Sequence, residues 1–170
     1  MMRLFFAIDI PKDIKEKISV FLKDSEISGN LVDKDNYHIT LKFLGEIEDL
    51  LPEVIKSVED ISFSSFECSL KNLGLFGPKN SPAVLFIEVN KGLDDLNTLN
   101  KLIDKATAKY NQDFKFQPHL TLARTPMIPK NIKDYNFKSI DFPVKEYHLM
   151  ESTVKKGKVL YKKIKSFKLK

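Results

Sequence analysis

The sequence predicts an α+β protein with a largely antiparallel sheet, and a repeated motif points to two halves that are related to each other. Three observations support this fold class. Helical and strand patterns are mixed along the chain, several strands follow one another directly, and one short motif recurs after nearly half the chain. With 170 residues the chain has the length of one domain or of two small, closely packed lobes.

Hydrophobic periodicity places the elements of the first half. A short apolar run that ends at Asp9 reads as a buried strand, and Pro11 suits the first turn of the helix that follows. Gly45 stops the next strand. The elements predicted here are a strand at 4–8, a helix over 11–22, a strand at 37–44, a helix at 49–61 and a strand at 66–75.

The second half contains the clearest helical pattern, with apolar residues at steps of three or four from Leu93 to Tyr110. Gly157 lies in a short polar turn between two apolar-rich stretches, which is typical of a hairpin. The elements predicted here are strands at 84–89 and 119–123, an irregular segment at 127–137, and strands at 144–154 and 159–169. A glycine-rich phosphate loop of the dinucleotide or P-loop type is absent from the sequence.

The chain has a mild excess of positive charge, +5 in total, which makes an anionic partner plausible. The excess is uneven, because no acidic residue follows Glu151. Two interpretations of this tail stay open: an edge strand protected by lysines, or a basic strip that contacts a nucleic-acid backbone. The tail lysines are Lys155, Lys156, Lys158, Lys162, Lys163, Lys165, Lys168 and Lys170.

Composition also limits the cofactors and the location. Cys68 is the only cysteine, which excludes an internal disulfide and a zinc site built from cysteines. The apolar runs are too short to cross a membrane. The first ten residues do not have the pattern of a signal peptide. We therefore expect a cytoplasmic protein, without membrane partners and monomeric.

The recurring motif is His-x-Thr-Leu, which occupies residues 38–41 and again 119–122. Both copies lie in predicted strands, where side chains alternate between the two faces. Each histidine therefore shares a face with the threonine of its motif, and the apolar residues take the other face. If the lobes are pseudo-symmetric, the polar faces meet in one cleft that holds His38, Thr40, His119 and Thr121.

Two imidazoles and two hydroxyls suit the hydrolysis of a phosphodiester. A neutral histidine can take a proton from water, and a charged one can give a proton to the leaving oxygen, since imidazole titrates near neutral pH. The hydroxyls can donate hydrogen bonds to phosphate oxygens. This chemistry needs no metal and no cofactor.

The motifs lie within longer blocks that are also familiar. These blocks are RLFFAID at 3–9, NYHITLKFLG at 36–45, LGLF at 73–76, PHLTLAR at 118–124, EST at 151–153, Gly157, Tyr161 and FKL at 167–169. Over nearly its whole length the chain resembles the two-histidine phosphoesterases, in particular the RNA 2′,3′-cyclic phosphodiesterases once named 2′-5′ RNA ligases.

The resemblance implies that residues 1–170 form a single domain of two pseudo-symmetric lobes, in which antiparallel sheet and helices surround a central cleft. It also implies a role for each site residue. His38 would be the general acid toward the 3′ oxygen and His119 the base for water, so that the product carries a 2′-phosphate. Thr40, Thr121 and Arg124 would bind the phosphate, and Phe43 would stack on a base. The implied partner is an RNA with a cyclic phosphate end, such as a tRNA fragment.

Strict alternation conflicts with two of these roles. It places Phe43 on the face of Ile39 and slightly favours a core position for it. It also turns Arg124 away from His119, unless the strand bulges or ends there; we expect an end that turns Arg124 toward the cleft. Alternation puts Lys42 on the face of His38, in contact with a phosphate or with solvent.

His148 lacks a threonine two residues later and matches no site of the family. We expect it at the surface or packed between strands.

Other functions remain to be separated by experiment. One is a weak, ATP-independent ligase that joins RNA halves through a 2′-5′ bond. Another is a non-catalytic nucleotide- or RNA-binding module on the same scaffold. A metallohydrolase that uses both histidines and a carboxylate is the third, although the sequence has no His-x-x-x-His pattern or cysteine pair.

Overall fold

The computed structural model describes residues 2–48, 51–78, 80–110 and 115–170. The strands are β1 (Met2–Asp9), β2 (Ser28–Leu31), β3 (His38–Ile47), β4 (Phe66–Phe76), β5 (Val84–Val89), β6 (His119–Met127), β7 (Ile140–Val144), β8 (Glu146–Lys155) and β9 (Lys158–Lys168). The helices are α1 (Lys12–Asp24), α2 (Leu51–Val58) and α3 (Leu93–Ala106), with short 3₁₀ turns at Lys34–Asn36, Ala108–Tyr110 and Ile132–Asp134.

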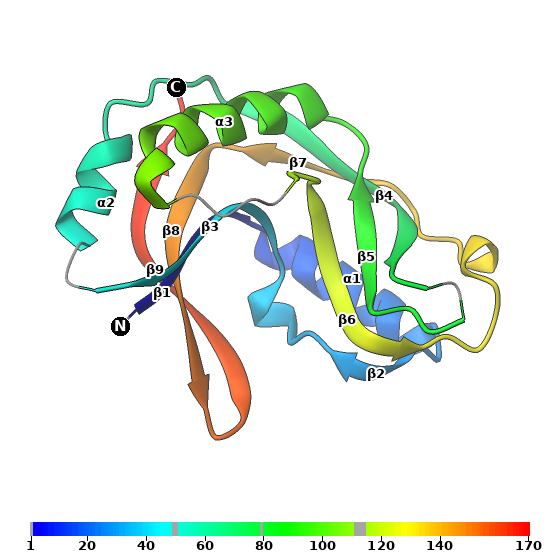
Figure 1. The fold of residues 1–170 in the computed structure, drawn as a ribbon. Helices are drawn as coiled ribbons and strands as arrows, with labels where there is room; N and C mark the ends of the chain where they lie inside the picture. Colours follow the sequence, from blue (N-terminus) through cyan, green and yellow to red (C-terminus); the bar gives the residue numbers. More distant parts are fainter. Residues whose placement is uncertain (1, 49–50, 79, 111–114) are drawn as a thin grey trace.

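The strands form one curled, nine-stranded sheet, which is visible in Figure 1. The order is β7-β4-β5-β6-β3-β1-β8-β9, with β2 paired to β6 off this path. The strand pairings of the described residues run antiparallel. The predicted α+β class with an antiparallel sheet is therefore confirmed. Strands β3 and β6 pair at only one position, where Ile39 lies opposite Leu120. The half of the sheet that ends in β6 therefore meets the half that begins with β3 at a single residue pair.

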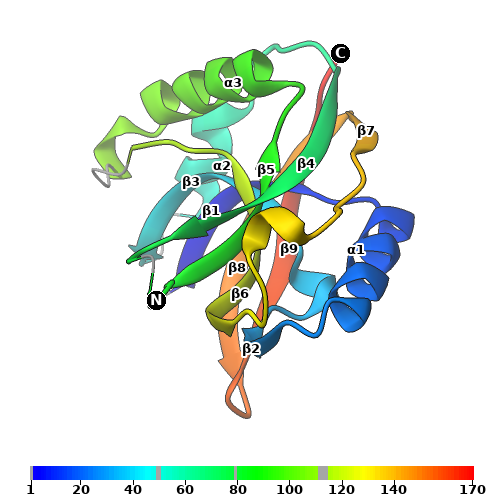
Figure 2. The ribbon, with the colours of Figure 1, turned by 90° about the vertical axis from the view of Figure 1, so that its right-hand side faces the viewer.

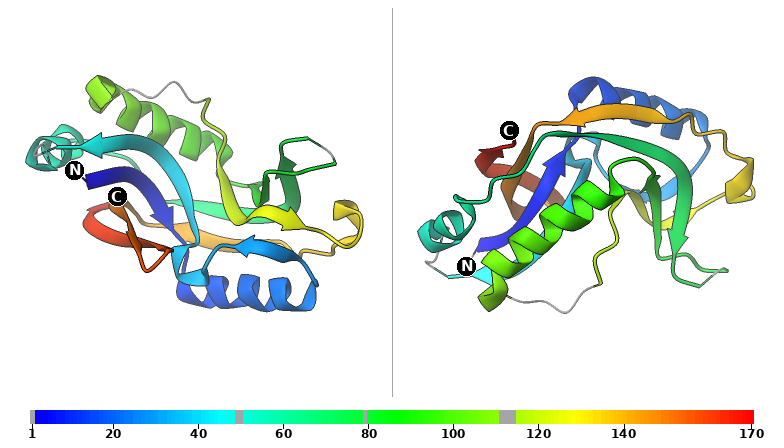
Figure 3. Two further views of the ribbon diagram at one scale, coloured as in Figure 1. Left: turned by 60° about the horizontal axis from the view of Figure 1, so that its bottom comes forward. Right: turned by 90° about the horizontal axis from the view of Figure 1, so that it is seen from above.

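Helices α1 and α3 lie at opposite ends of the molecule, with the strands between them in both views of Figure 3. In each helix the buried residues recur every three or four positions, so one apolar stripe faces inward. Both stripes join the same buried cluster, so the helices hold the two halves of the sheet together. The buried stripes are Ile14, Ile18 and Leu22 in α1, and Leu96, Leu99 and Ile103 in α3.

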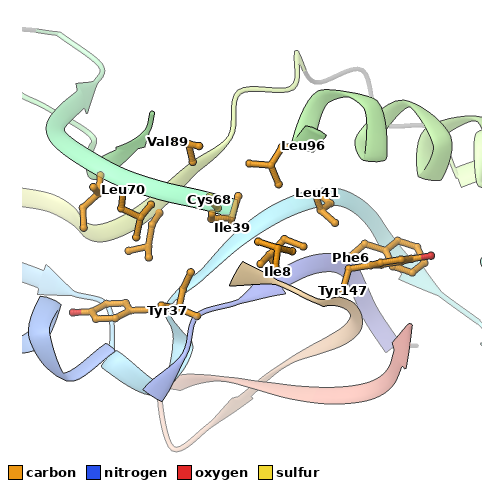
Figure 4. Close-up of a cluster of buried hydrophobic side chains, with 14 of the residues drawn as sticks. Phe6, Ile8, Tyr37, Ile39, Leu41, Cys68, Leu70, Val89, Leu96 and Tyr147 are labelled. Carbon is orange, nitrogen blue, oxygen red and sulfur yellow. The ribbon is translucent and has the colours of Figure 1, made fainter. Parts of the chain in front are cut away.

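The core lies on one face of the strands that carry the motifs. Figure 4 shows Ile39 and Leu41 of β3 close to Ile8 of β1 and Leu96 of α3, in a cluster that also contains Tyr147. Ile39, Leu41 and Leu120 are at most 1% exposed. Burial of this face leaves the opposite face of the same strands free to carry polar groups.

The hairpin of β8 and β9 is confirmed, with Lys156 and Gly157 at its turn. Strand β9 is the last strand of the sheet, so the lysine-rich tail is an edge strand. In Figures 1 and 2 the turn of this hairpin projects beyond the body of the molecule.

The structure corrects several element boundaries. Strand β2 was not predicted, because its four residues are all exposed and show no apolar alternation. The strand expected at 144–154 is two strands, β7 and β8, which separate at Lys145. Helix α2 ends at Val58 rather than at residue 61, and its expected start at Asp49 lies outside the described residues.

Helix α3 ends at Ala106, and its last predicted turn is a 3₁₀ turn instead. The change occurs at Thr107, whose hydroxyl donates to the carbonyl of Ile103. None of the helices in the described ranges is both long and apolar enough to span a membrane.

Candidate active site

The two His-x-Thr motifs meet at the junction of the two half-sheets. Their middle residues, Ile39 and Leu120, are the single paired position between β3 and β6, and both are fully buried. Because side chains alternate along a strand, the histidines and threonines of both motifs lie on the opposite face. The antiparallel register sets His38 across from the second threonine and His119 across from the first. Each histidine thus lies next to a residue of the pair that joins the two strands.

His38 is held by its own strand and by aromatic rings. Its Nδ1 lies 2.7 Å from the carbonyl oxygen of Asn36, and its Nε2 lies 3.0 Å from the hydroxyl of Thr40. A carbonyl only accepts hydrogen bonds, so Nδ1 carries the proton and Nε2 is the nitrogen that titrates. The rings of Phe5 and Tyr161 lie 5.2 and 5.0 Å from the imidazole, between centroids.

His119 has the same arrangement in the other half. Its Nδ1 lies 2.6 Å from the carbonyl oxygen of Gln117, two residues earlier, and this again leaves Nε2 to titrate. The rings of Phe76 and Phe86 flank it at 5.0 and 5.3 Å. Gly74 makes room for one of these rings, since a Cβ there would lie 2.4 Å from Phe86 Cζ.

Both imidazoles are neutral in the free protein at neutral pH. Burial lowers the pKa of His38 to about 4, although the Asn36 carbonyl and the charge of Asp9 act in the opposite direction. Burial also lowers the pKa of His119, and the positive charge of Arg124 lowers it further. A nearby negative charge, such as that of a phosphate, would raise both pKa values and favour the protonated imidazoles.

Each motif strand contains a β-bulge directly after its threonine. In β3, Thr40 and Lys42 are partners of adjacent residues of β1, so Leu41 is the extra residue. In β6, Thr121 and Ala123 are partners of adjacent residues of β5. A bulge shifts the alternation of side chains by one position. The bulges therefore lie at equivalent places in the two motifs.

The bulge in β6 turns Arg124 to the face of His119. The strand continues to Met127, so the expected strand end is wrong, and the bulge is the reason why this arginine leaves the core face. Its charge influences the pKa of both His119 and Tyr161, which places it within electrostatic range of both motif regions.

The bulge in β3 turns Phe43 away from the core face and turns Lys42 toward it. Phe43 is 43% exposed, with its ring 5.9 Å from that of Phe5, so the core position is wrong. Lys42 is buried, and its ammonium group forms an ion pair with Asp104 of α3 at 2.5 Å. Lys42 therefore does not share the face of His38, contrary to strict alternation.

The third histidine, His148, is packed between strands, as one of the two expectations had it. It is 2% exposed, and its Nδ1 lies 2.9 Å from the hydroxyl of Ser166. It lines a separate hollow of about 650 Å³ together with Asp9 and Lys163. This hollow contains neither motif histidine.

A cleft of about 440 Å³ opens beside the motifs. Of the predicted site residues, Thr40, Phe43 and His119 line it, and the wall on the other side comes from α3 and the segment before β6. Residues that were not singled out complete the surroundings. Asn36 and Gln117 fix the two tautomers, a role that their shared position two residues before each histidine would have revealed.

Within the described ranges of the chain, no three histidine, cysteine or acidic side chains are grouped closely enough to bind a metal ion. The polar groups at the junction are instead two imidazoles and two hydroxyls, with a guanidinium nearby. This set can exchange protons and donate hydrogen bonds to an anion.

An α+β sheet that brings paired His-x-Thr motifs to one face defines a two-histidine phosphoesterase. The family model described as LigT like Phosphoesterase matches residues 8–86. An RNA 2′,3′-cyclic phosphodiesterase of Methanocaldococcus jannaschii is 35% identical over 98% of this chain and 100% of that protein. One of Archaeoglobus fulgidus is 30% identical over 98% and 99%. The chain belongs to the LigT-like phosphoesterase family.

Solved structures agree with this assignment. Escherichia coli LigT in apo form superposes with a TM-score of 0.81 at 26% identity, over 99% of this chain and 97% of that one. The same enzyme complexed with 3′-AMP gives a TM-score of 0.82 at 25% identity, with the same coverage.

Proposed function

We propose that this protein hydrolyses the 2′,3′-cyclic phosphate at the end of an RNA and leaves a 2′-phosphate. The observation that carries the proposal is the junction of β3 and β6, where two imidazoles of the same tautomer share a face with two hydroxyls. The names of the relatives, RNA 2′,3′-cyclic phosphodiesterase, support the substrate class.

The reaction adds one water across one P–O bond. Nε2 of His119 takes a proton from water as the water oxygen bonds to phosphorus. The bond from phosphorus to O3′ breaks, and Nε2–H of His38 gives its proton to that oxygen. Both histidines return to their initial states after one proton moves from His119 to His38 through solvent.

The unequal burial of the histidines suits these roles. The lower pKa of His38 makes its protonated form the stronger acid toward the leaving oxygen, and the less perturbed His119 is the stronger base. The negative charge of the bound cyclic phosphate raises the pKa of the adjacent His38, so that this imidazole takes up the proton that it lacks in the free protein.

The developing charge on the phosphate needs donors that are already in place. Thr40 and Thr121 can donate from opposite strands to the non-bridging oxygens, and Arg124 adds a full positive charge. Phe43 offers an exposed ring on the same face, on which a base can stack. The proposed reaction uses no metal and no cofactor, and the proposed setting is the cytoplasm.

The test is to incubate the protein, in EDTA, with a short RNA that ends in a 2′,3′-cyclic phosphate. Mass spectrometry should show the gain of one water, and treatment with phosphatase and periodate should locate the phosphate on O2′. The His38→Ala and His119→Ala variants should give no product above background. A second incubation with broken tRNA halves, without ATP, measures the reverse joining reaction.

Three outcomes would contradict the proposal. Tight RNA binding without product would make the cleft a recognition site. Loss of activity in EDTA, restored by added zinc, would indicate a metallohydrolase. A 3′-phosphate product would reverse the assignment of the leaving oxygen.

A further inference from the structure

The excess positive charge of this protein lies in its C-terminal segment, which contains the last strand. Residues 152–170 contain eight lysines and no acidic residue, whereas residues 1–151 contain 20 lysines and arginines against 23 acidic residues. The net charge of +5 is therefore a C-terminal segment of +8 on a body of −3. The C-terminal segment therefore carries the net attraction for a nucleic-acid backbone.

Three of the eight lysines lie at the projecting tip of the β8–β9 hairpin (Figures 1 and 2). Lys155 and Lys158 lie directly opposite each other across the two strands, and Lys156 occupies the turn. No ion pair involves these three lysines in the part of the chain that the structure describes. Like charges that face each other across a sheet destabilise it, so this pair of lysines costs stability.

The turn itself is also suboptimal for stability. Lys156 has φ +51° and Gly157 has φ +76°, the pair of positive values found in the tight turns of hairpins. Asparagine or glycine is preferred at the first of these positions, because glycine has no Cβ to clash at positive φ and the short side chain of asparagine hydrogen-bonds locally. A lysine at this position thus adds charge at a further cost in stability.

The base of the hairpin is fixed to the active site. The ring of Tyr161 in β9 lies 5.0 Å from that of His38. The side chain of Asn36, whose carbonyl holds His38, donates to the carbonyl of Val159 at 2.8 Å and accepts from the amide of Tyr161 at 3.3 Å. Since a strand rises about 3.3 Å per residue, the tip lies about 13 Å beyond Tyr161.

The face of the hairpin that continues from Tyr161 is apolar. Val159 shares that face by alternation and pairs with Val154. These two side chains are 44% and 72% exposed. Lys155 and Lys158 lie on the opposite face by the same alternation. The apolar side chains can contact ribose and base edges, while the long lysine side chains at the tip reach phosphates.

We propose that the β8–β9 hairpin is an RNA-binding arm that holds the nucleotides upstream of the cyclic phosphate end. The inference rests on the proposed hydrolysis of RNA ends and assigns the partner of the same site. The lysines contact the phosphates without regard to sequence, so the arm selects polynucleotides over single cyclic nucleotides.

The test replaces the charges of the tip without disturbing the turn. The variant carries Lys155→Thr, Lys156→Asn and Lys158→Thr, which introduce strand-forming residues and an Asn-Gly turn. The control carries Lys17→Ser, Lys23→Ser and Lys138→Ser, which remove the same charge from exposed positions on α1 and before β7. Both proteins are assayed with a 12-nucleotide RNA that ends in a cyclic phosphate and with 2′,3′-cyclic AMP.

We expect kcat/KM of the tip variant to fall for the RNA, on the order of tenfold at low salt, and to stay unchanged for 2′,3′-cyclic AMP. The slope of log kcat/KM against log salt should become shallower by about 2, which corresponds to three lost phosphate contacts on a single strand. The control should behave as the wild type. Thermal unfolding should show the tip variant to be at least as stable as the wild type.

Equal losses in the tip variant and the control would overturn the arm, because total charge would then explain the effect. A failure of the wild type to hydrolyse 2′,3′-cyclic AMP and RNA alike would instead contradict the proposed function. A third result would also overturn the arm. In it, the wild type and the tip variant process RNA equally, but only the wild type sediments with vesicles that contain phosphatidylserine. The hairpin would then be a membrane contact.

Discussion

Strands β3 and β6 contain the same motif and the same bulge, but they are supported differently. The carbonyl of Leu41, the extra residue in β3, accepts a hydrogen bond from the side chain of Asn100 in α3 at 2.8 Å. The carbonyl of Leu122, the equivalent residue in β6, accepts from the backbone amide of Val32 at 2.8 Å. One bulge thus depends on a particular side chain, and the other depends only on the path of the chain.

The environments of the two histidines differ as well. His38 lies between Phe5 and Tyr161, and its Nε2 is hydrogen-bonded to the hydroxyl of Thr40. Burial lowers its pKa to about 4. The ring of His119 lies beside the open cleft. Two copies of one motif have therefore become different in acidity, and this difference allows one imidazole to act as the acid and the other as the base.

The largest expected effect comes from the histidines themselves. His38→Ala and His119→Ala should each reduce turnover of 2′,3′-cyclic AMP by about 10²–10⁴-fold, since each removes one proton transfer. The double variant should be little worse than the worse single variant, because the two act as a unit. Multiplicative losses in single-turnover rates would show that the two halves act independently.

Arg124 and Phe43 follow the two bulges at equivalent positions, and their replacement separates charge from stacking. Arg124→Met should raise KM by about 10- to 100-fold, because a charged hydrogen bond to phosphate is lost. Phe43→Leu should raise KM less and leave kcat nearly unchanged. Steady-state kinetics with 2′,3′-cyclic AMP measure both; a larger effect of Phe43→Leu would contradict the role of Arg124 in phosphate binding.

The pH dependence reports the difference between the histidines. The mechanism needs one protonated and one neutral imidazole, and both pKa values lie below 6.5 in the free protein. Above the higher pKa the protonated form is lost, so kcat/KM should fall about tenfold per pH unit. The kcat profile should extend to higher pH, because bound phosphate raises both pKa values. A kcat/KM that is constant up to pH 8 would contradict the neutral state of the free site.

The smallest expected effect tests the support of the β3 bulge. Asn100→Ala should lower the free energy of unfolding by about 1–3 kcal/mol, because it leaves the Leu41 carbonyl without a donor. Asn97→Ala on the same helix is a matched control, since that side chain donates at the same 2.8 Å to the exposed carbonyl of Leu93. The control should change stability by less than about 0.5 kcal/mol.

Chemical denaturation measures the free energy of unfolding of both variants. Their KM values show whether Phe43, which follows the bulge, has kept its position. Equal stability of the two variants would show that the bulge does not need Asn100.

Much of the site was predictable from local sequence. Each His-x-Thr motif, the alternation that buries Ile39 and Leu120, and the hairpin at Gly157 follow from patterns within ten residues. Each pattern reflects a local property, either the two faces of a strand or the positive φ of a turn.

The face on which Phe43, Lys42 and Arg124 lie was decided elsewhere. A bulge is a mismatch between a strand and its neighbour, and these neighbours, β1 and β5, are distant in sequence. The same is true of β2, an exposed strand that exists because β6 offers it a partner.

The sequence by itself thus determined the chemical groups of this protein: two imidazoles, two hydroxyls and a basic last strand. The tertiary structure alone decided that the motifs meet at one residue pair, that Arg124 and Phe43 face the site, and that the two histidines differ in acidity. The reason is that register, desolvation and hydrogen bonding to a second strand depend on segments that only folding brings together.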